Sequence, residues 1–378
     1  MRILALNAGS SSIKFALFDG HKRLCSGQVS GVGGRPRFKA DGIEESWEAE
    51  EPTALAMRLL HWVEHHGGQR LDAVGHRVVH GGSDFREPVR VDSEILDRIE
   101  ALTPLAPLHQ PASVAPMRLI ARHRADLPQV ACFDTAFHHH IAPPVSRYPL
   151  PQDCEKVWGI RRFGFHGLSY EAIADKLRRS DPAAQDQRIV VAHLGQGASL
   201  CALRHLRSVD TTMGFTALDG IMMGTRPGSL DPGILLYLLK EKGLSADDLE
   251  DLLYHRSGLL GVSAISSDMA ELLASQEPAA HEAIDLYCFL VARHVAALVV
   301  TLGGLDRLVF TGGVGQHAPA IRGRVMERLR WLKIVADGEA NALSQRVISS
   351  SESVVTAEVI PTDEEQIISA HVARLLEA

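Results

Sequence analysis

Residues 3–18, ILALNAGSSSIKFALF, place two apolar runs on either side of a small, polar turn. Residues 3–7 and 13–18 are each typical of a buried strand, and the AGSSS segment between them is typical of a turn. We therefore expect a hairpin near the start of the chain. Its tip is rich in hydroxyl and backbone N–H groups, which together form the kind of nest that holds anions.

The same pattern returns in the second half of the chain. Residues 188–193, RIVVAH, predict a strand, residues 194–198, LGQGA, predict a turn, and residues 199–203 predict a second strand. The stretches LNAGSSSIKFALF and AHLGQGASLCALR agree in pattern more than in identity. They indicate either an internal repeat, with one copy in each half of the chain, or two unrelated hairpins.

Strands and helices alternate along the rest of the chain. Further strands are expected at residues 73–79, 129–133, 307–311 and 354–360, and helices at residues 53–65, 112–123, 278–302 and 364–376. This interleaving is typical of the α/β class. A length of 378 residues favours two domains, and the Pro-rich segment 143–151 is a candidate hinge between them.

Charge and composition argue against several classes of protein. The formal net charge of −7 disfavours nonspecific nucleic-acid binding. The five cysteines are scattered without a CxxC pair, as in reduced cytosolic proteins. The apolar run at 291–305 is interrupted by Arg293 and His294, which indicates a buried helix rather than a membrane span. The first apolar run is too short for a signal peptide, so we expect a cytoplasmic protein with no membrane or nucleic-acid partner.

Three Gly-rich turns, each after an expected strand, point to polyphosphate binding. They are NAGSSS at 7–12, GQGAS at 195–199 and TGGVG at 311–315. Glycine lets the backbone approach a ligand closely, and clustered N–H groups bind anions. None of the three fits the P-loop pattern or a GxGxxG that opens a helix. Lys14 follows the first turn, where it either reaches a phosphate or is solvated.

Polar side chains follow several expected strands. Arg77 and His80 lie in GHRVVHGG, Asp134 in FDTAFH, His166 in RRFGFHG and Arg226 in MGTRPG. Loops at strand ends are where α/β folds bind their ligands. Guanidinium groups suit phosphate and carboxylate because their donors are planar and paired.

This combination of side chains fits phosphoryl transfer. The reaction needs in-line positioning, Mg²⁺ and positive charge beside the phosphoryl oxygens. Each arginine taken alone is also typical of a surface ion pair, so the inference depends on the set. The acidic segment 363–365 is typical of a helix N-terminus, and it also follows an expected strand, where a carboxylate can direct Mg²⁺.

Together these motifs resemble the acetate kinase family, of the superfamily of acetate and sugar kinases, Hsp70 and actin. The matching stretches are LNAGSSSIKF (6–15), GHRVVHGG (75–82), LAPLHQP (105–111), FDTAFH (133–138), RRFGFHGLSY (161–170), HLGQGASL (193–200), DTTMGFTALDGIMMGTRPGSLDPG (210–233), TGGVGQHAP (311–319) and VIPTDEE (359–365). They run in family order, so the resemblance covers nearly the whole chain.

The resemblance implies a duplicated, ribonuclease H-like fold of the actin and hexokinase type, with two lobes and an active-site cleft between them. Residues 1–146 with 366–378 would form the first lobe, and 147–365 the second, nucleotide-binding lobe. The implied activity is reversible, direct in-line phosphoryl transfer between ATP and acetate, which gives ADP and acetyl phosphate and uses Mg²⁺, or alternatively Mn²⁺. A homodimer is implied as well.

Carried over position by position, the resemblance implies four groups of site residues. Asp134, His166 and Arg226 would be catalytic. Arg77, Val79, Leu108, His109 and Phe165 would bind the substrate, with Arg77 holding its carboxylate. Ser10, Ser12, Lys14, His193, Leu194, Gly195, Gln196, Gly197, Asp268, Gly313, Val314, Gly315, Gln316 and His317 would bind the nucleotide and its phosphates. Asn7 and Glu364 would direct the metal ion, mostly through water.

The departures from the family pattern leave alternatives open. Gln196 stands where the family usually has Asn, Gln316-His317 where it has Glu-Asn, and Ala270 where an Arg is common. All of these lie on the nucleotide side, so GTP or pyrophosphate is an alternative phosphoryl donor. Ala217 replaces a Pro of the substrate pocket, which leaves a propionate or other short-chain acyl kinase as an alternative. A non-catalytic nucleotide-binding relative is a more remote one.

Overall fold

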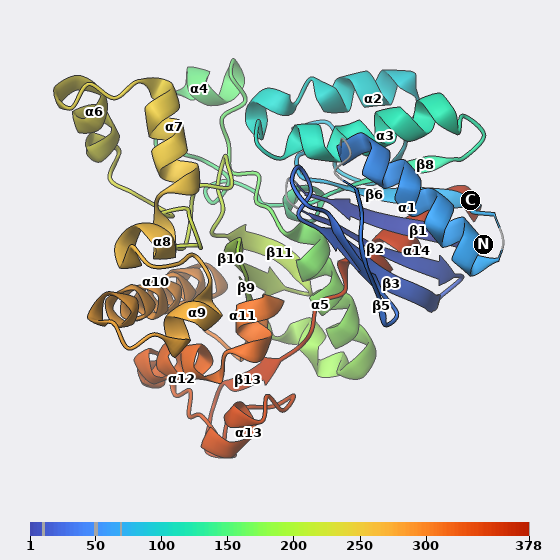
Figure 1. Ribbon diagram of the computed structural model, residues 1–378. Coiled ribbons are helices and arrows are strands. Elements are labelled where there is room, and N and C mark those ends of the chain that lie inside the picture. The colour runs from blue at the N-terminus through green and yellow to red at the C-terminus, as the bar shows by residue number, and fades with distance from the viewer. Residues whose placement is uncertain (10–11, 49–51, 69, 378) are drawn as a thin grey trace. The chain divides into compact units, whose positions relative to one another are not determined.

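The computed structural model describes residues 1–9, 12–48, 52–68 and 70–377 (Figure 1). The chain divides into two compact units. The first holds residues 1–139, 167–172 and 363–378, and the second holds residues 140–166 and 173–362. The lobes expected at 1–146 with 366–378 and at 147–365 stay a prediction.

One mixed sheet forms the centre of the first unit. Within the described residues it has eight strands, in the order β5-β4-β3-β2-β1-β6-β8-β7. Their bounds are Arg2–Ala8 (β1), Ser12–Asp19 (β2), Lys22–Ser30 (β3), Arg37–Ala40 (β4), Ile43–Ser46 (β5), Ala73–Val78 (β6), Val89–Arg90 (β7) and Gln129–Phe133 (β8). Neighbours among β1 to β5 are antiparallel, whereas β1, β6 and β8 are parallel.

Successive side chains of a strand point to opposite faces of the sheet. On one face, Leu4 and Leu6 pack with residues of α1 (Pro52–Gly67) and α3 (Gln110–His123). On the other face, Ile3 and Ala5 pack with residues of α14 (Glu364–Glu377) and of the first turns of α5 (Gly167–Ser180). Because both faces are covered, β1 is apolar at successive positions rather than at alternate ones.

The second unit contains a five-stranded sheet within the described residues, in the order β11-β10-β9-β12-β13. The bounds are Arg188–Leu194 (β9), Ala198–Arg204 (β10), Arg207–Thr211 (β11), Arg307–Thr311 (β12) and Thr356–Val359 (β13). Here β9, β10 and β11 are antiparallel neighbours, and β9, β12 and β13 are parallel.

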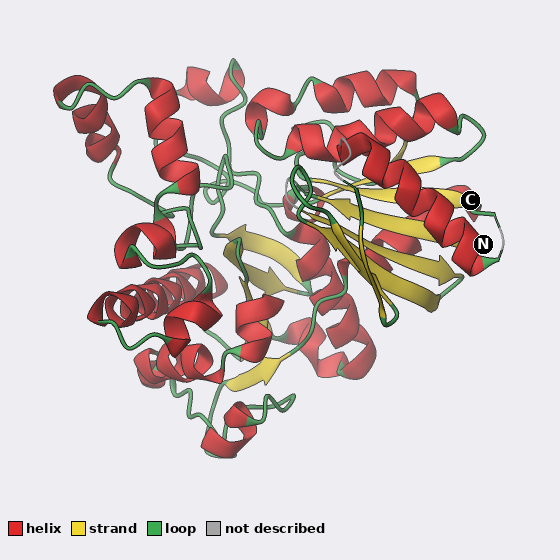
Figure 2. Ribbon diagram, in the orientation of Figure 1, coloured by secondary structure: helices red, strands yellow, loops and turns green. Residues whose placement is uncertain are grey.

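The two sheets share one topology. The order β3-β2-β1-β6-β8 in the first unit corresponds to β11-β10-β9-β12-β13 in the second, with the same strand directions. The internal repeat is therefore confirmed over the alternative of unrelated hairpins, and so is the α/β class. Figure 2 shows strands in yellow and the helices against them in red.

The remaining helices lie mostly in the second unit. Their bounds are Ser93–Glu100 (α2), Gln152–Lys156 (α4), Pro232–Glu241 (α6), Ala246–His255 (α7), Gly258–Ser263 (α8), Met269–Ala274 (α9), Pro278–Leu302 (α10), Gly312–His317 (α11), Pro319–Arg328 (α12) and Gly338–Ala342 (α13). Short 3₁₀ turns occupy Thr103–Leu105, Ala136–His138, Pro182–Asp186 and Arg330–Leu332.

Helix α10 is apolar because it is a core helix. Among the described residues, α10 is the one helix whose length and composition would allow it to cross a membrane. Its residues Ile284, Val291 and Val295 are fully buried or nearly so, and the helix packs on β9, β10 and β11. The expectation of a buried helix at 278–302 is confirmed.

Candidate active site

Three predicted site residues of the first unit share one face of its sheet. Asn7 lies at the end of β1 on the same face as Ile3 and Ala5, because alternate residues share a face. Arg77 lies beside it on the parallel strand β6, where Leu6 of β1 pairs with His76. Asp134 directly follows β8. The carboxyl ends of parallel strands meet at one edge of a sheet, which explains why these distant residues come together.

Arg77 binds two of these neighbours directly. Its Nε donates to both carboxylate oxygens of Asp134, at 3.1 and 3.0 Å, and NH1 donates to Asn7 Oδ1 at 3.0 Å. Asn7 Nδ2 in turn donates to Glu364 Oε2 at 3.0 Å. Asp134 is 1% exposed and Glu364 is 14% exposed. The four side chains therefore form one bonded set, which we call the Arg77 cluster.

The cluster stabilises the charge of Arg77. Burial alone would lower the pKa of the guanidinium, but the carboxylates of Asp134 and Glu364 raise that pKa above its ordinary value. Burial raises the pKa of the neighbouring Glu365 carboxyl, and the charge of Glu364 adds to this effect. Arg77 is thus fixed in place and stays charged, with N–H groups left over for a bound carboxylate.

Glu364 reaches the cluster because α14 packs very closely on β6. Gly75 makes this possible: a Cβ added there would lie 2.4 Å from Ile368 Cγ2 and 2.7 Å from Val372 Cγ2. A second close approach occurs at Gly167, whose N–H donates to the carbonyl of Asp134 at 3.0 Å. A Cβ on Gly167 would lie 2.1 Å from that carbonyl oxygen. Both glycines are needed for space beside the cluster.

The donors of the cluster fit a magnesium ion that keeps most of its water. Mg²⁺ is usually bound by one or two carboxylates, water and substrate phosphates rather than by a complete protein cage. Asn7 and Glu364 offer amide and carboxylate oxygens in a half-buried position. Within the described part of the chain, no group of three or more His, Cys, Asp or Glu side chains is placed to hold a metal.

The other predicted residues of the first unit lie on neighbouring elements. Lys14 pairs with Asn7 in the β1–β2 register, so both point to the same face. Val79 is buried after β6, and Leu108 and His109 are half-buried before α3. Ser12 begins β2 and is half-buried, whereas Ser10 lies outside the described residues.

His80, which the sequence places beside Arg77, holds a turn in place. Its backbone exchanges hydrogen bonds with the Gln110 side chain, at 3.1 and 3.0 Å, and its Nδ1 accepts from the N–H of Gly82 at 2.8 Å. The side chain is fully buried, and burial lowers its pKa to about 4. His80 is therefore neutral near pH 7 and shapes the loop after β6.

A second set of predicted residues meets in the second unit. His166 Nδ1 lies 2.9 Å from Ser199 Oγ of β10. The His166 ring stacks on His193 of β9, with centroids 4.4 Å apart. Gly197 lies against this pair: a Cβ there would be 3.3 Å from His166 Nε2 and 2.8 Å from Arg226 NH2. The turn between β9 and β10 thus carries glycine where two cationic or potentially cationic side chains approach its backbone.

Two backbone features fix His166 and Arg226. His166 has φ of 58° and lies at the N-cap of α5, a left-handed conformation that costs energy for a non-glycine residue. Arg226 NH1 donates to the carbonyl oxygen of Ala217 at 2.8 Å. Burial lowers the pKa of Arg226, while the charge of Tyr254 opposes that shift.

The predicted nucleotide residues lie on three segments of the second unit. Gln196 is exposed, and its Nε2 donates to Ser267 Oγ at 3.3 Å. Asp268 caps α9, because its Oδ1 accepts from the N–H groups of Ala270 and Glu271 at 2.7 and 3.2 Å. The Gly-rich segment expected as a turn at 311–315 instead begins the short helix α11, which spans Gly313 to His317 of the predicted set. Leu194 ends β9 and is buried, and Phe165 is 2% exposed.

Nothing in the sequence indicates the role of Arg322. Arg322 of α12 is fully buried, and its NH1 donates to the carbonyls of Gly315 and Gln316 at 2.9 and 2.8 Å. Its other donors bind Asn341 and Ser344. Arg322 therefore holds the end of α11, but a single Arg in the polar segment PAIRGRVMER gives no sign of burial.

A model of the acetokinase family matches residues 2–370 of the chain. The chain belongs to the acetokinase family. An acetate kinase of Rhodopseudomonas palustris is 49% identical over 99% of this chain and 98% of its own length. An acetate kinase of Rickettsia prowazekii is 36% identical over 99% of each chain.

Solved structures of acetokinase relatives agree with this assignment. A propionate kinase from Francisella tularensis has a TM-score of 0.92 and 36% identity, and covers 98% of each chain. An acetate kinase from Porphyromonas gingivalis has a TM-score of 0.89 and 35% identity, and covers 99% of each chain. The resemblance read from the motifs is confirmed at the level of family and fold. The individual site residues stay predictions.

Proposed function

We propose that this member of the acetokinase family is an acetate kinase, which transfers a phosphoryl group reversibly between ATP and acetate. The observation that carries the proposal is the Arg77 cluster, in which a charged guanidinium is fixed by Asp134 and Asn7 and retains N–H groups. A short carboxylic acid presents the planar, paired acceptors that such a group binds best.

In this proposal the first unit recognises the acid. Arg77 binds the carboxylate of acetate, and Asp134 keeps the guanidinium in the required orientation through its paired hydrogen bonds. His109 is proposed to contact the carboxylate, and Val79 and Leu108 are proposed to contact the methyl group. Binding the acid at a fixed angle supplies the in-line geometry that direct transfer needs.

The second unit supplies charge for the transferred group. His166 and Arg226 stabilise the equatorial oxygens of the phosphoryl group, and their shared approach to the Cβ side of Gly197 supports this assignment. A preorganised donor of this kind is worth on the order of 10²–10³ in rate. The nucleotide is proposed to bind to residues 193–197, Asp268 and residues 313–317 of the second unit, and Ser12 and Lys14 of the first unit are proposed to bind phosphate.

Asn7 and Glu364 are proposed to direct a Mg²⁺ ion through water, with Mn²⁺ as a substitute. A divalent cation at this position neutralises charge on the phosphates. The hydrogen bond between Asn7 and Glu364 orients the oxygen atoms of both side chains before any ion binds.

A homodimer is proposed from the surface of α6. Its residues Ile234, Leu236, Tyr237 and Leu239 are exposed to between 37 and 54%, and Leu230 precedes them at 42%. Several exposed apolar side chains on one helix are typical of a subunit interface. The protein is also proposed to act in the cytoplasm, on small molecules alone.

Acyl phosphate formation tests the proposal. Acetate, propionate and butyrate are each incubated with ATP, GTP or pyrophosphate, and the product is trapped as the hydroxamate. We expect the highest kcat/KM with acetate and ATP. Equal or better turnover with propionate would contradict the acetate assignment, which matters because Ala217 stands where the family has a Pro of the substrate pocket and one methylene is worth only about 1–3 kcal/mol. A thermal shift with Mg-ATP but no product from any acid would indicate the non-catalytic alternative.

A further inference from the structure

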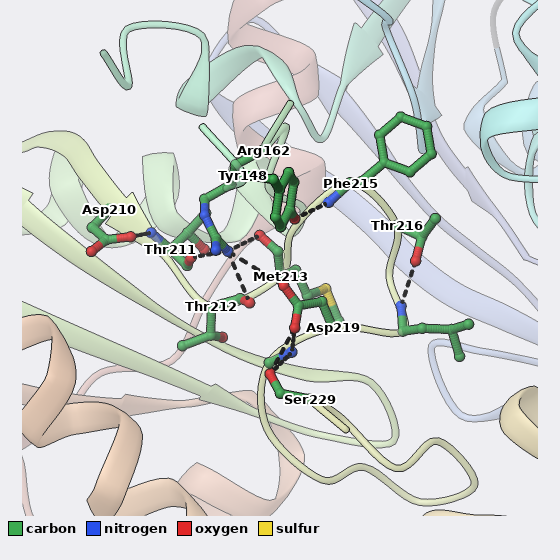
Figure 3. Close-up of polar contacts among 12 residues, drawn as sticks. Tyr148, Arg162, Asp210, Thr211, Thr212, Met213, Phe215, Thr216, Asp219 and Ser229 are labelled. Carbon is green, nitrogen blue, oxygen red and sulfur yellow. Dashed lines mark hydrogen bonds and ion pairs between the residues drawn. The ribbon is translucent and has the colours of Figure 1, made fainter. Parts of the chain in front are cut away.

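Tyr148 lies in the segment 143–151, which contributes no residue to the proposed site. Its side chain contacts a loop of the second unit. The backbone N–H of Phe215 donates to Tyr148 Oη at 2.7 Å (Figure 3). Gly214 lies against the same hydroxyl: a Cβ there would be 1.9 Å from Tyr148 Oη and 2.4 Å from Asp219 Oδ2. Burial raises the pKa of Tyr148, and the charge of Asp219 adds to this effect. The hydroxyl therefore stays protonated, and it accepts from Phe215 close to the Asp219 carboxylate.

Asp219 and Arg162 complete this contact, and we call the three side chains the Tyr148 clamp. Asp219 Oδ1 accepts from the N–H of Gly220 at 2.8 Å and from Ser229 Oγ at 2.6 Å. Arg162 NH1 lies 3.6 Å from Asp219 Oδ2.

Arg162 also fixes the strand that leads into the loop. Its NH1 donates to the carbonyls of Thr211, Thr212 and Met213, at 3.0, 3.3 and 3.3 Å (Figure 3). The clamp therefore holds the segment 211–220 at both ends. A loop held at both ends has few conformations available to its middle.

The middle of this loop touches Arg226. The carbonyl oxygen of Ala217 accepts from Arg226 NH1 at 2.8 Å. The guanidinium of Arg226 is thus oriented by the backbone carbonyl of Ala217. The position of that carbonyl depends on the conformation of its loop.

We propose that Tyr148 is a positioning residue for Arg226, acting through the loop 214–219 and the carbonyl of Ala217. The inference rests on the proposed function, which assigns Arg226 to the transferred phosphoryl group. A misplacement of about 1 Å can cost on the order of 10²-fold in rate. Loss of one hydroxyl relaxes the loop only in part, so a loss on the order of tenfold in kcat is expected.

Tyr148→Phe tests this role against a matched control. Tyr287 lies fully buried in α10, and within the described residues its hydroxyl has no hydrogen-bond partner. We expect Tyr148→Phe to lower kcat about tenfold with the KM for ATP nearly unchanged, and Tyr287→Phe to leave both unchanged. Phenylglyoxal should modify Arg226 faster in Tyr148→Phe than in the wild type or the control, as read by mass spectrometry.

A double-mutant cycle separates positioning from a general effect on the fold. In an Arg226→Ala background, Tyr148→Phe should lower kcat no further, because the group that it positions is gone. An equal loss in both backgrounds overturns the proposal, and so does an unchanged rate of Arg226 modification. If the wild type forms no acyl phosphate, the proposed function fails, and the modification rates still decide whether Tyr148 orients Arg226.

Discussion

Gly75 lies in β6 under α14, and replacing it by alanine should disturb both stability and the proposed metal site. A Cβ at this position would lie 2.4 Å from Ile368 Cγ2, whereas real Cβ contacts essentially never fall below 3.0 Å. To restore an allowed contact, α14 must move away from β6 by about 0.6 Å, or the backbone of β6 must move by that amount.

The displacement has two consequences of calculable size. Overpacking a core of this kind costs about 1–3 kcal/mol, which corresponds to a fall in Tm of roughly 2–12 °C for a unit of this length. The same movement takes Glu364 away from Asn7. Their present separation of 3.0 Å between Nδ2 and Oε2 would become about 3.6 Å, which is too long for a hydrogen bond.

Thermal melting and a Mg²⁺ titration of hydroxamate formation measure both effects. For Gly75→Ala we expect a lower Tm and a higher Mg²⁺ concentration at half-maximal activity. Gly338→Ala is the control, because a Cβ there meets no atom within 4 Å, and it should change neither quantity. In an Ile368→Ala background the further loss from Gly75→Ala should shrink, since its closest contact is removed. An unaltered Tm and Mg²⁺ dependence in Gly75→Ala would refute the reasoning.

Three further perturbations test other parts of the molecule. Arg226→Ala should lower kcat on the order of 10²–10³-fold while the circular dichroism spectrum stays that of the wild type; near-normal turnover would contradict its assigned role. Arg322→Lys keeps the charge but loses the fork that binds the carbonyls of α11, so urea unfolding should show a loss of about 2–4 kcal/mol and the KM for nucleotide should rise. Burial lowers the pKa of His76 and of His80 to about 4, so between that value and 6.5 the unfolded chain binds more protons than the folded one. Stability should therefore be full above pH 6.5 and fall by about 2 kcal/mol per histidine at pH 5, and denaturation at several pH values should give a shallower dependence for His76→Gln than for the wild type.

The strands that carry the Arg77 cluster could be predicted from the sequence because each follows a local rule. Apolar runs such as residues 3–7 predict buried strands, and a polar residue directly after such a run, such as Asp134, lies at a sheet edge. The parallel arrangement of β1, β6 and β8 then brings residues from separate strands together. No knowledge of side-chain packing was needed for this step.

What could not be predicted depends on packing between elements. The sequence around Gly75 is that of an ordinary strand. Only the position of α14 shows that a side chain would not fit there. Tyr148 lies within the Pro-rich segment 143–151, which the sequence predicts as a hinge, and nothing in that segment points to Phe215 as its partner. Arg322 stands in a polar helix, and its burial follows from the carbonyls that it meets at the end of α11. These contacts depend on how separate elements pack against each other, and they leave no periodic pattern in the sequence.

The two sheets share one topology, so residues at equivalent positions in the two copies can be compared. Asn7 is the penultimate residue of β1, and His193 is the penultimate residue of β9. Asn7 pairs with Lys14 on the next strand of its hairpin, and His193 pairs with Ser199 on its own. The same two positions thus carry a cation and an amide in one copy, and a hydroxyl and an imidazole in the other.

A third position extends this contrast. Arg77 is hydrogen-bonded to Asn7 from the neighbouring parallel strand, and Thr311 occupies the corresponding place beside His193. The first copy therefore gathers charged groups, which suit a carboxylate and a metal ion with its water shell. In the second copy these positions carry an imidazole and two hydroxyl groups, and its Gly-containing turn offers backbone N–H groups. The same hairpin edge, present in both units, in this way carries two chemically different sets of side chains.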